Sequence, residues 1–271
     1  KRYQLLFFPV ALFSLAIGHF FLPSSVIEEK FHIEKNITQD KALDGSGEIF
    51  IQFRNATDAK KWINVNDDKY SIEYPAFNPK DKTFLLDEYA VIDLKDNHSI
   101  ESAISKLEND PLIAYLEFNE ELTLSLPEPA RLLRQSESLH INDPDKDKQW
   151  MANKFDLDKF HKRMKEKSDS QTDNQTLIAI LDTGVDALHE DLKENYISIS
   201  ERSDADERGH GTDCAGIAAA VTGNKIGIAS WLPPQSQIKV TSVKVMTGFG
   251  VGTQRTIING IIKAADNGAD V

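Results

Sequence analysis

Two short motifs in the second half of the chain could work together in proton transfer: Asp182-Thr183-Gly184 and Gly209-His210-Gly211-Thr212. Asp182 follows an apolar run, residues 177–181, and open α/β sheets place their active sites at the carboxyl ends of their strands. His210 opens a stretch of small residues that is typical of a helix. A carboxylate beside an imidazole fixes its tautomer and supports the imidazolium ion, so the pair predicts a general base with an orienting acid.

Taken singly, each motif has another interpretation. A strand followed by Asp-Thr-Gly is also the start of the catalytic loop of an aspartic protease, and a lone Asp182 can simply cap a turn. A single histidine is usually a structural residue with satisfied ring nitrogens. The glycines on both sides of His210, however, indicate close approach of other backbone or of a substrate.

The elements around these motifs alternate between strands and helices. The run 177–181 is apolar at every position, as expected for a parallel strand that is buried on both faces. The pattern then predicts a helix over 211–220, a strand over 238–245, a helix over 256–267 that Gly268 ends, and the start of a strand at 269–271. This alternation predicts a doubly wound parallel α/β sheet, incomplete at residue 271.

The first half of the chain predicts a separate, small α+β domain over residues 47–121. Its expected elements are a strand at 48–53, a helix at 56–64, a strand region within 83–94 that is clearest at 90–94, a helix at 99–109 and a strand at 112–118. A domain of about 70 residues is near the lower size limit for independent folding.

The remaining segments are predicted to serve export or connection. Lys1 and Arg2 precede an apolar run from Leu5 to Leu22, which predicts a signal peptide within residues 1–25, with an uncleaved membrane anchor as the alternative. Residues 26–46 are interpreted as a linker, 122–147 as an exposed segment suited to processing, and 159–176 as a charged surface loop or insertion. The larger α/β domain then occupies residues 148–271.

Composition excludes some partners. The formal net charge of −12 argues against nucleic acid and anionic membrane surfaces, which need clustered Lys and Arg. Cys214 is the only cysteine, so no disulfide can form within the chain. The cysteine count does not decide between a cytosolic and an exported protein.

The two motifs together resemble the subtilase family of serine proteases, and the resemblance continues through 224–229, 242–245, 250–253, 257–261 and 264–271. It implies a serine endopeptidase in which Asp182 orients His210 and His210 is the general base. The family's nucleophilic Ser and oxyanion-hole Asn would lie beyond Val271. The 271-residue chain alone is therefore expected to be inactive.

The resemblance also implies binding residues. Gly250, Val251 and Gly252 match the strand edge that pairs with extended peptide substrates, and Met246 and Ile257 match positions that line substrate pockets, although both could be core residues. Asp191 and Asn224 match ligands of a structural Ca²⁺ site, with a charged loop that holds no metal as the alternative. Cys214 resembles the thiol of one branch of the family, where a small buried hydrophobe is expected and sensitivity to mercurials is implied.

The small domain resembles the inhibitory propeptide of the same family, which implies a zymogen that is secreted and processed between residues 122 and 141. The chain's expected partners are thus polypeptide substrates and its own propeptide, with membrane contact only through an uncleaved leader. One alternative is a truncated pseudoprotease whose propeptide-like domain acts as a protease inhibitor or folding chaperone. An aspartic protease is the third candidate, but it would need a second Asp-Thr-Gly motif, which this sequence lacks.

Overall fold

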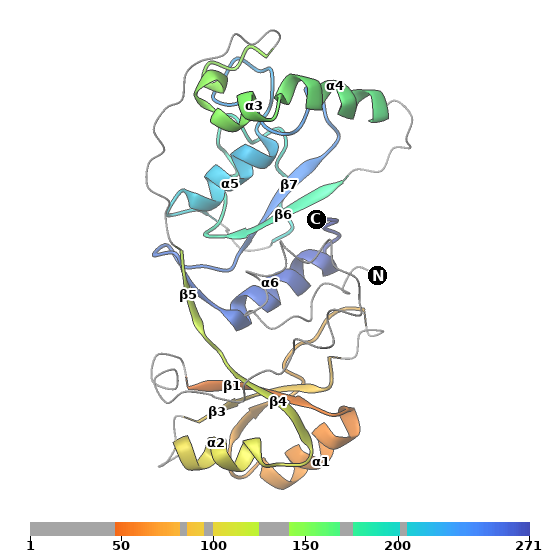
Figure 1. Ribbon diagram of the computed structural model, residues 1–271, viewed down its shortest axis with the longest axis vertical. Coiled ribbons are helices and arrows are strands. Elements are labelled where there is room, and N and C mark those ends of the chain that lie inside the picture. The colour runs from red at the N-terminus through yellow and green to blue at the C-terminus, as the bar shows by residue number, and fades with distance from the viewer. Residues whose placement is uncertain (1–46, 82–85, 95–99, 125–140, 169–175, 201–204) are drawn as a thin grey trace. The chain divides into compact units, whose positions relative to one another are not determined.

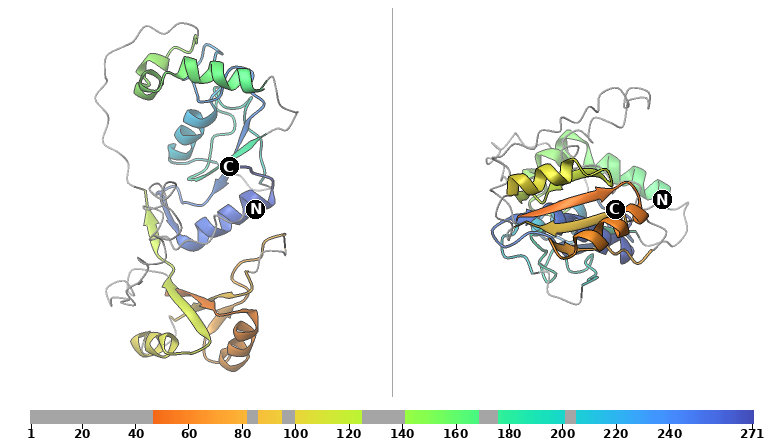
Figure 2. Two further views of the ribbon diagram at one scale, coloured as in Figure 1. Left: turned by 45° about the vertical axis from the view of Figure 1, so that its right-hand side comes forward. Right: turned by 90° about the horizontal axis from the view of Figure 1, so that it is seen from below.

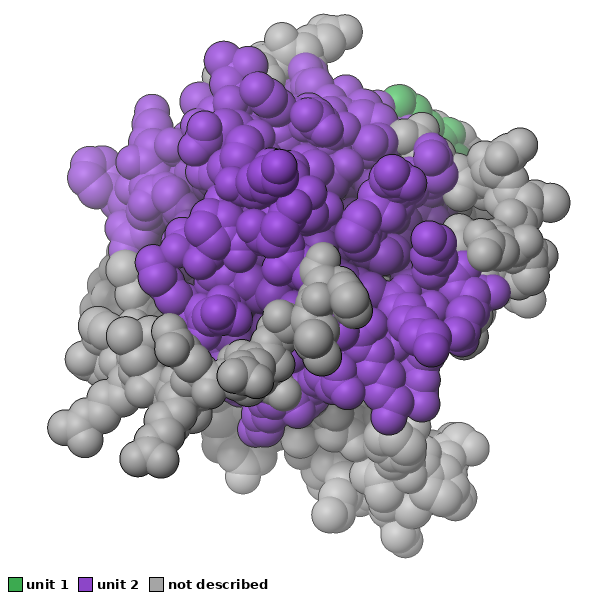
Figure 3. Space-filling view, turned by 90° about the horizontal axis from the view of Figure 1, so that it is seen from above, with its two compact units in different colours: residues 1–121, 253–259 green, residues 122–252, 260–271 purple. Residues whose placement is uncertain are grey.

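The computed structural model describes residues 47–81, 86–94, 100–124, 141–168, 176–200 and 205–271. The predicted leader (1–25), the predicted linker (26–46) and residues 125–140 of the predicted processing segment lie outside these ranges. Contacts divide the chain into two compact units, residues 1–121 with 253–259 and residues 122–252 with 260–271. Figure 3 shows a face of the second unit in purple.

The first unit is built on a four-stranded antiparallel sheet with the order β2-β3-β1-β4 (Figure 1). Its strands are β1 (Glu48–Phe53), β2 (Ser71–Glu73), β3 (Tyr89–Asp93) and β4 (Ile113–Phe118). In the inner strand β1, Ile51 pairs with Ala90 of β3 on one side and with Leu116 of β4 on the other. The sequence predicted three of these strands; β2 was missed, because only three residues form it.

Two helices cover one face of this sheet, α1 (Ala56–Asn66) and α2 (Ile100–Glu108), as Figures 1 and 2 show. The Asn55 side chain accepts a hydrogen bond from the Asp58 amide and caps α1. Trp62 of α1 packs in the core against Phe53 and donates its indole proton to Asp110 at 2.9 Å. Both helices were predicted, within two residues at each end.

The second unit centres on a parallel pair, β6 (Leu177–Asp182) and β7 (Lys239–Lys244), in which Leu181 is the partner of Val243. α5 (His210–Ala219) packs on β6, and the later turns of α6 (Gln254–Asp266) reach β7, where a side chain at Gly260 would overlap Val245. Gly268 ends α6 with a φ of 89°. This is the α/β fold that the alternation predicts.

Two predictions about the sheet need correction. Residues 177–181 are half-buried rather than buried on both faces, because among the described residues only β7 pairs with β6 as a full strand. Residues 269–271 form no strand, yet the Asp270 amide donates to the Leu177 carbonyl and the Ala179 amide donates to the Val271 carbonyl. Residues 269–271 thus form backbone hydrogen bonds with β6, but over too few residues to make a strand.

The prediction of a surface loop over 159–176 is wrong for its first part. α4 (Leu157–Ser168) follows α3 (Trp150–Lys154), and residues 169–175 are not described. Leu157 and His161 are buried one turn apart, and Phe160 meets the Trp231 ring edge-on at 5.1 Å. The many Lys and Glu residues conceal this narrow apolar stripe. Over the residues that the structure describes, no helix has the length and apolar character needed to span a membrane.

Candidate active site

Asp182 is the last residue of β6 and 8% of its surface is exposed. One of its carboxylate oxygens accepts a hydrogen bond of 2.7 Å from the Thr183 amide. Its carbonyl oxygen accepts from the amides of Val245 and Met246, which follow β7. The parallel register therefore fixes both the backbone and the carboxylate of Asp182 at the carboxyl edge of the sheet.

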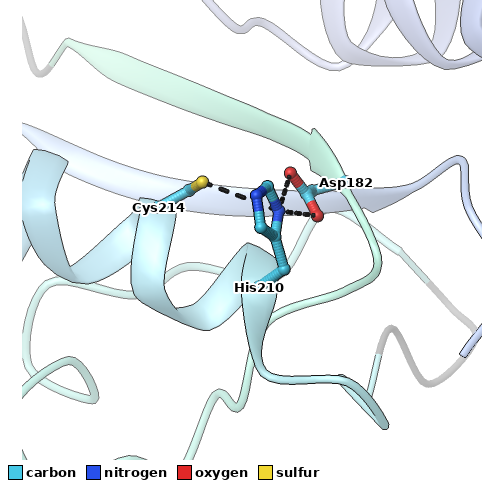
Figure 4. Close-up of side chains that lie close together, drawn as sticks. All are labelled: Asp182, His210 and Cys214. Atoms are coloured by element: carbon cyan, nitrogen blue, oxygen red, sulfur yellow. Dashed lines mark hydrogen bonds and ion pairs between the residues drawn. The ribbon is translucent and has the colours of Figure 1, made fainter. Parts of the chain in front are cut away.

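His210 is the first residue of α5, and its Nδ1 lies 2.8 Å from each carboxylate oxygen of Asp182 (Figure 4). The side chain of His210 is 24% exposed and that of Asp182 11%. An Nδ1–H group here donates to a largely buried carboxylate and leaves Nε2 as the free base. The arrangement can hold one tautomer and stabilise the imidazolium when it accepts a proton.

The glycines around His210 allow this close approach. A Cβ at Gly211 would overlap the Gly184 carbonyl oxygen, so only glycine lets α5 begin against the end of β6. Gly209 has a φ of 89°, a left-handed conformation in which a side chain is strained. The predicted contact with other backbone is thus present at Gly211.

Cys214 lies one turn after His210, with its Sγ 3.9 Å from Nδ1 (Figure 4). It is half-buried, where the sequence predicted a buried residue. Ligand atoms of Asp182, His210 and Cys214 lie within 4.8 Å of one another, a spacing that a metal ion could also use. However, burial and then the charges of Asp182 and Asp213 raise the pKa of the thiol to about 11. A neutral thiol is a poor metal ligand and a poor nucleophile.

The predicted peptide-binding edge, Gly250 to Gly252, lies next to a segment of the same chain. β8 (Val251–Thr253) pairs with β5 (Glu121–Thr123), and the Leu124 amide donates to the Gly250 carbonyl at 2.9 Å. Gly250 has a φ of 76°, and its amide donates back to the Thr247 carbonyl. The start of the predicted connecting segment is therefore a strand.

Several known proteins are similar to parts of this chain. The model of the subtilase family matches residues 173–271. Thermitase of Thermoactinomyces vulgaris is 46% identical over 99 residues, which are 35% of this chain and 34% of thermitase. A thermophilic serine proteinase of Bacillus sp. (strain AK1) is 28% identical over 243 residues, 88% of this chain and 53% of that protein.

Residues 173–271 belong to the subtilase family. The fold agrees with it: the crystal structure of fervidolysin from Fervidobacterium pennivorans superposes with a TM-score of 0.52, at 20% sequence identity, over 83% of this chain and 35% of fervidolysin. The chain spans about a third of thermitase and about half of the Bacillus proteinase.

The two predicted pocket residues of the subtilase domain are both half-buried. Met246 follows β7 and its amide donates to the Asp182 carbonyl at 3.2 Å, so its backbone is tied to the active-site edge. Ile257 lies in α6, in the part that is assigned to the first unit.

The predicted calcium ligands of the subtilase domain lie together. The Asp191 carboxylate is buried and accepts hydrogen bonds from the Asn224 side chain at 2.8 Å and from the Ile228 amide at 3.0 Å. Sequence reasoning missed a third member, Asp143, which is also buried and accepts from the amides of Gly223 and Asn224. No spacing rule links Asp143 to a loop so far along the chain.

The same site has the electrostatics of a cation site. Burial raises the pKa of the Asp191 carboxyl and the charge of Asp143 adds to this, although the bonds from Ile228 and Asn224 oppose it. A Cβ at Gly227 would overlap an Asp191 oxygen, so the glycine keeps the loop backbone against the carboxylate. Two buried carboxylates are donors that Ca²⁺ prefers, so Asp191 and Asp143 fit the ion. The Asn224 amide turns Nδ2 toward Asp191, while its Oδ1 accepts from the Ile226 amide at 2.7 Å, so this amide would have to rotate to offer its oxygen to the ion.

A second residue that sequence reasoning missed is Asp206, which precedes α5. Its carboxylate accepts hydrogen bonds from Thr183, beside Asp182, and from the backbone that leads into His210. A signal was available, because an Asp shortly before a helix start often caps the helix. The bond to Thr183 could not be read from the sequence, because it depends on how β6 meets α5.

Proposed function

We propose that this chain is part of a serine endopeptidase that hydrolyses peptide bonds of extended polypeptides. The observation that carries the proposal is the pairing of Asp182 and His210 at 2.8 Å, with the carboxylate largely buried and the imidazole partly exposed. Membership of residues 173–271 in the subtilase family supports the same reaction class. The Bacillus relative, whose name describes a serine proteinase, is similar to 88% of this chain.

In the proposed mechanism Asp182 accepts a hydrogen bond from the Nδ1 proton of His210, which leaves the lone pair of Nε2 available to accept a proton. Nε2 takes the proton of a serine hydroxyl as it attacks the peptide carbonyl, and returns it to the leaving amine. We place this serine outside the 271 residues, because Ser230 and Ser242 are almost fully buried and no serine of the sequence lies in a nucleophile motif. The chain alone is accordingly expected to be inactive.

We propose that Gly250, Val251 and Gly252 bind the substrate main chain as an added strand, with Met246 and Ile257 in the neighbouring pockets. The pairing of β5 with β8 supports this, because an extended segment already bonds to that edge. We also propose that residues 47–121 act as an intramolecular inhibitor until processing between 122 and 141 releases them, as their resemblance to the inhibitory propeptide of the family implies. Export through the 1–25 leader would place this zymogen outside the cell.

We propose that Asp191, Asn224 and Asp143 hold a structural Ca²⁺ ion. The ion would neutralise the two buried carboxylates and tie the loop at 223–228 to residues 142–143. Its contribution is to stability, since none of these side chains contacts Asp182 or His210 among the described contacts.

The test uses the complete gene product, assayed on casein after processing. Hydrolysis that phenylmethylsulfonyl fluoride abolishes is expected, and His210→Ala should remove it. Asp213→Asn is the matched control, because Asp213 is an exposed acid in the same helical turn. Casein hydrolysis that survives His210→Ala, or that is blocked by pepstatin instead, would exclude the proposed mechanism.

A further inference from the structure

Asp206 accepts five hydrogen bonds, more than any cap of one helix requires. One oxygen accepts from the Thr183 hydroxyl at 2.8 Å, the Arg208 amide at 3.0 Å and the Gly209 amide at 2.9 Å. The other accepts from the amide and the hydroxyl of Thr212, at 2.9 and 2.7 Å. The carboxylate is thus saturated by donors from two different elements.

The first set of bonds reaches Asp182. Thr183 follows Asp182, is fully buried, and donates its amide to the Asp182 carboxylate at 2.7 Å. Its hydroxyl donates to Asp206 and accepts from the Gly211 amide at 3.1 Å. The hydroxyl of Thr183 therefore joins the residue after the acid to the residue after the base.

The second set of bonds fixes the start of α5. Gly209 and Thr212 lie on either side of His210, and Asp206 binds the amide of each. The Gly209 position has no side chain with which to cap the helix, so Asp206 performs that role from outside it. The Thr212 hydroxyl also accepts from the Asp186 amide at 3.0 Å, which extends the network to the loop after β6.

These contacts keep Asp206 ionised. Burial alone would raise the pKa of Asp206, but the hydrogen bonds from Thr212, Thr183 and Gly209 outweigh it and lower the pKa from 3.8 to about 2. The helix N-terminus favours the same charge. The carboxylate is therefore a permanent acceptor at any pH at which a general-base histidine is neutral.

We propose that Asp206 is a positioning residue for the Asp182–His210 pair: through Thr183 and the first turn of α5 it sets the distance between Nδ1 and the carboxylate. A simple helix cap would bind Gly209 and Thr212 but would have no reason to bind the residue beside Asp182. The consequence for catalysis rests on the proposed function, whereas the geometric claim does not.

The first experiment is NMR on the 271-residue chain with ¹⁵N-labelled histidine. The proton on Nδ1 of His210, bonded to Asp182, should give a downfield signal protected from exchange with water. Asp206→Asn should broaden or abolish it, because the new amide group faces the Thr212 donors. Asp213→Asn, which removes a neighbouring charge from the same turn, should leave it in place.

A second pair of variants keeps the test valid where Asp206→Asn does not fold. Thr183→Val has nearly the same volume but lacks the hydroxyl, and should weaken the signal; Thr183→Ser keeps the hydroxyl and should restore it. In the complete gene product, Asp206→Asn should lower kcat by about tenfold to 100-fold with little change in KM, as expected for lost orientation.

A signal that persists in folded Asp206→Asn and Thr183→Val would overturn the positioning role, whatever the enzyme's activity. A wild-type chain without any such signal would overturn the Asp182–His210 pair itself and with it the proposed function. The two failures are therefore distinguishable. Equal loss of signal in Thr183→Val and Thr183→Ser would also contradict the proposal, because the hydroxyl would then not matter.

Discussion

At the scale of single residues, the site depends on how charge is distributed around one imidazole. Asp182 is the acid that touches His210, and Asp206 binds the Thr183 hydroxyl and the Gly209 amide, each one residue away from the pair, without touching the ring. Cys214 stays neutral beside them because burial and the charge of Asp182 raise its pKa to about 11. Of these three neighbours, Asp182 is thus the one whose carboxylate can accept a proton from Nδ1.

Replacement of Asp182 by Asn should test its orienting role in the complete gene product. The amide can donate to Nδ1 and so favours the wrong tautomer, which leaves Nε2 protonated and unable to accept. We expect kcat to fall by about 10⁴-fold with the fold unchanged. Steady-state kinetics together with thermal unfolding measures both quantities, and a loss below about tenfold would argue against this role.

Asp206 should make stability depend on pH in the acid range. Its pKa is about 2 in the folded chain against 3.8 as the ordinary value, so the unfolded chain binds the proton more readily. The stabilisation is complete above about pH 4 and is lost as pH falls toward 2. The melting temperature of Asp206→Asn should therefore approach that of the wild type at low pH; a constant difference from pH 6 to pH 2.5 would contradict the shifted pKa.

At the scale of elements, the contact between β6 and α5 decides the geometry of the site. Gly211 brings the helix start against the Gly184 carbonyl, which leaves no room for a side chain. Gly216, on the same helix, is different: a Cβ there would meet Ile228 at 3.5 Å, an ordinary contact. Close packing therefore requires glycine at position 211, whereas position 216 has room for a methyl group.

Alanine variants at these two positions should therefore differ in stability. Gly211→Ala should destabilise the chain by about 1–3 kcal/mol, since backbone must move to relieve the overlap. Gly216→Ala should be neutral or stabilise by up to about 1 kcal/mol, because alanine favours the helix. Urea unfolding followed by circular dichroism gives both values, and equal effects of the two changes would show that the contact with Gly184 is not tight.

The sequence predicted most elements and missed those whose pattern is weak or non-local. Local residue patterns predicted α1, β1 and α5, and the Asp-Thr-Gly and Gly-His-Gly-Thr motifs were sufficient to predict that Asp182 and His210 act as a pair, which lies at 2.8 Å in the structure. α4 was missed because its charged residues hide a stripe of few apolar positions. Asp206 and Asp143 were missed because their partners come from distant segments, and such contacts exist only once the chain has folded.

At the scale of the whole molecule, a cation should link distant segments of the second unit. Asp143 binds the loop at Gly223, and that loop's Asn224 binds Asp191, so three segments meet around two buried carboxylates. Without a cation the two charges repel each other, which is part of why the pKa of Asp191 is raised above 3.8. Bound calcium would turn this repulsion into attraction.

Calcium removal should therefore lower the melting temperature of the 271-residue chain. At a Ca²⁺ concentration 100 times Kd, the ion would add about 2.7 kcal/mol to the free energy of unfolding. Chelation should remove this gain in the wild type and in Asp213→Asn, whereas Asp191→Asn and Asp143→Asn should no longer respond to calcium. Differential scanning calorimetry with and without chelator measures the four shifts. If the chelator leaves the melting temperature of the wild type as unchanged as that of Asp191→Asn, Asp191 and its neighbours hold no calcium. Their carboxylates would then serve only to join the loop to residues 142–143.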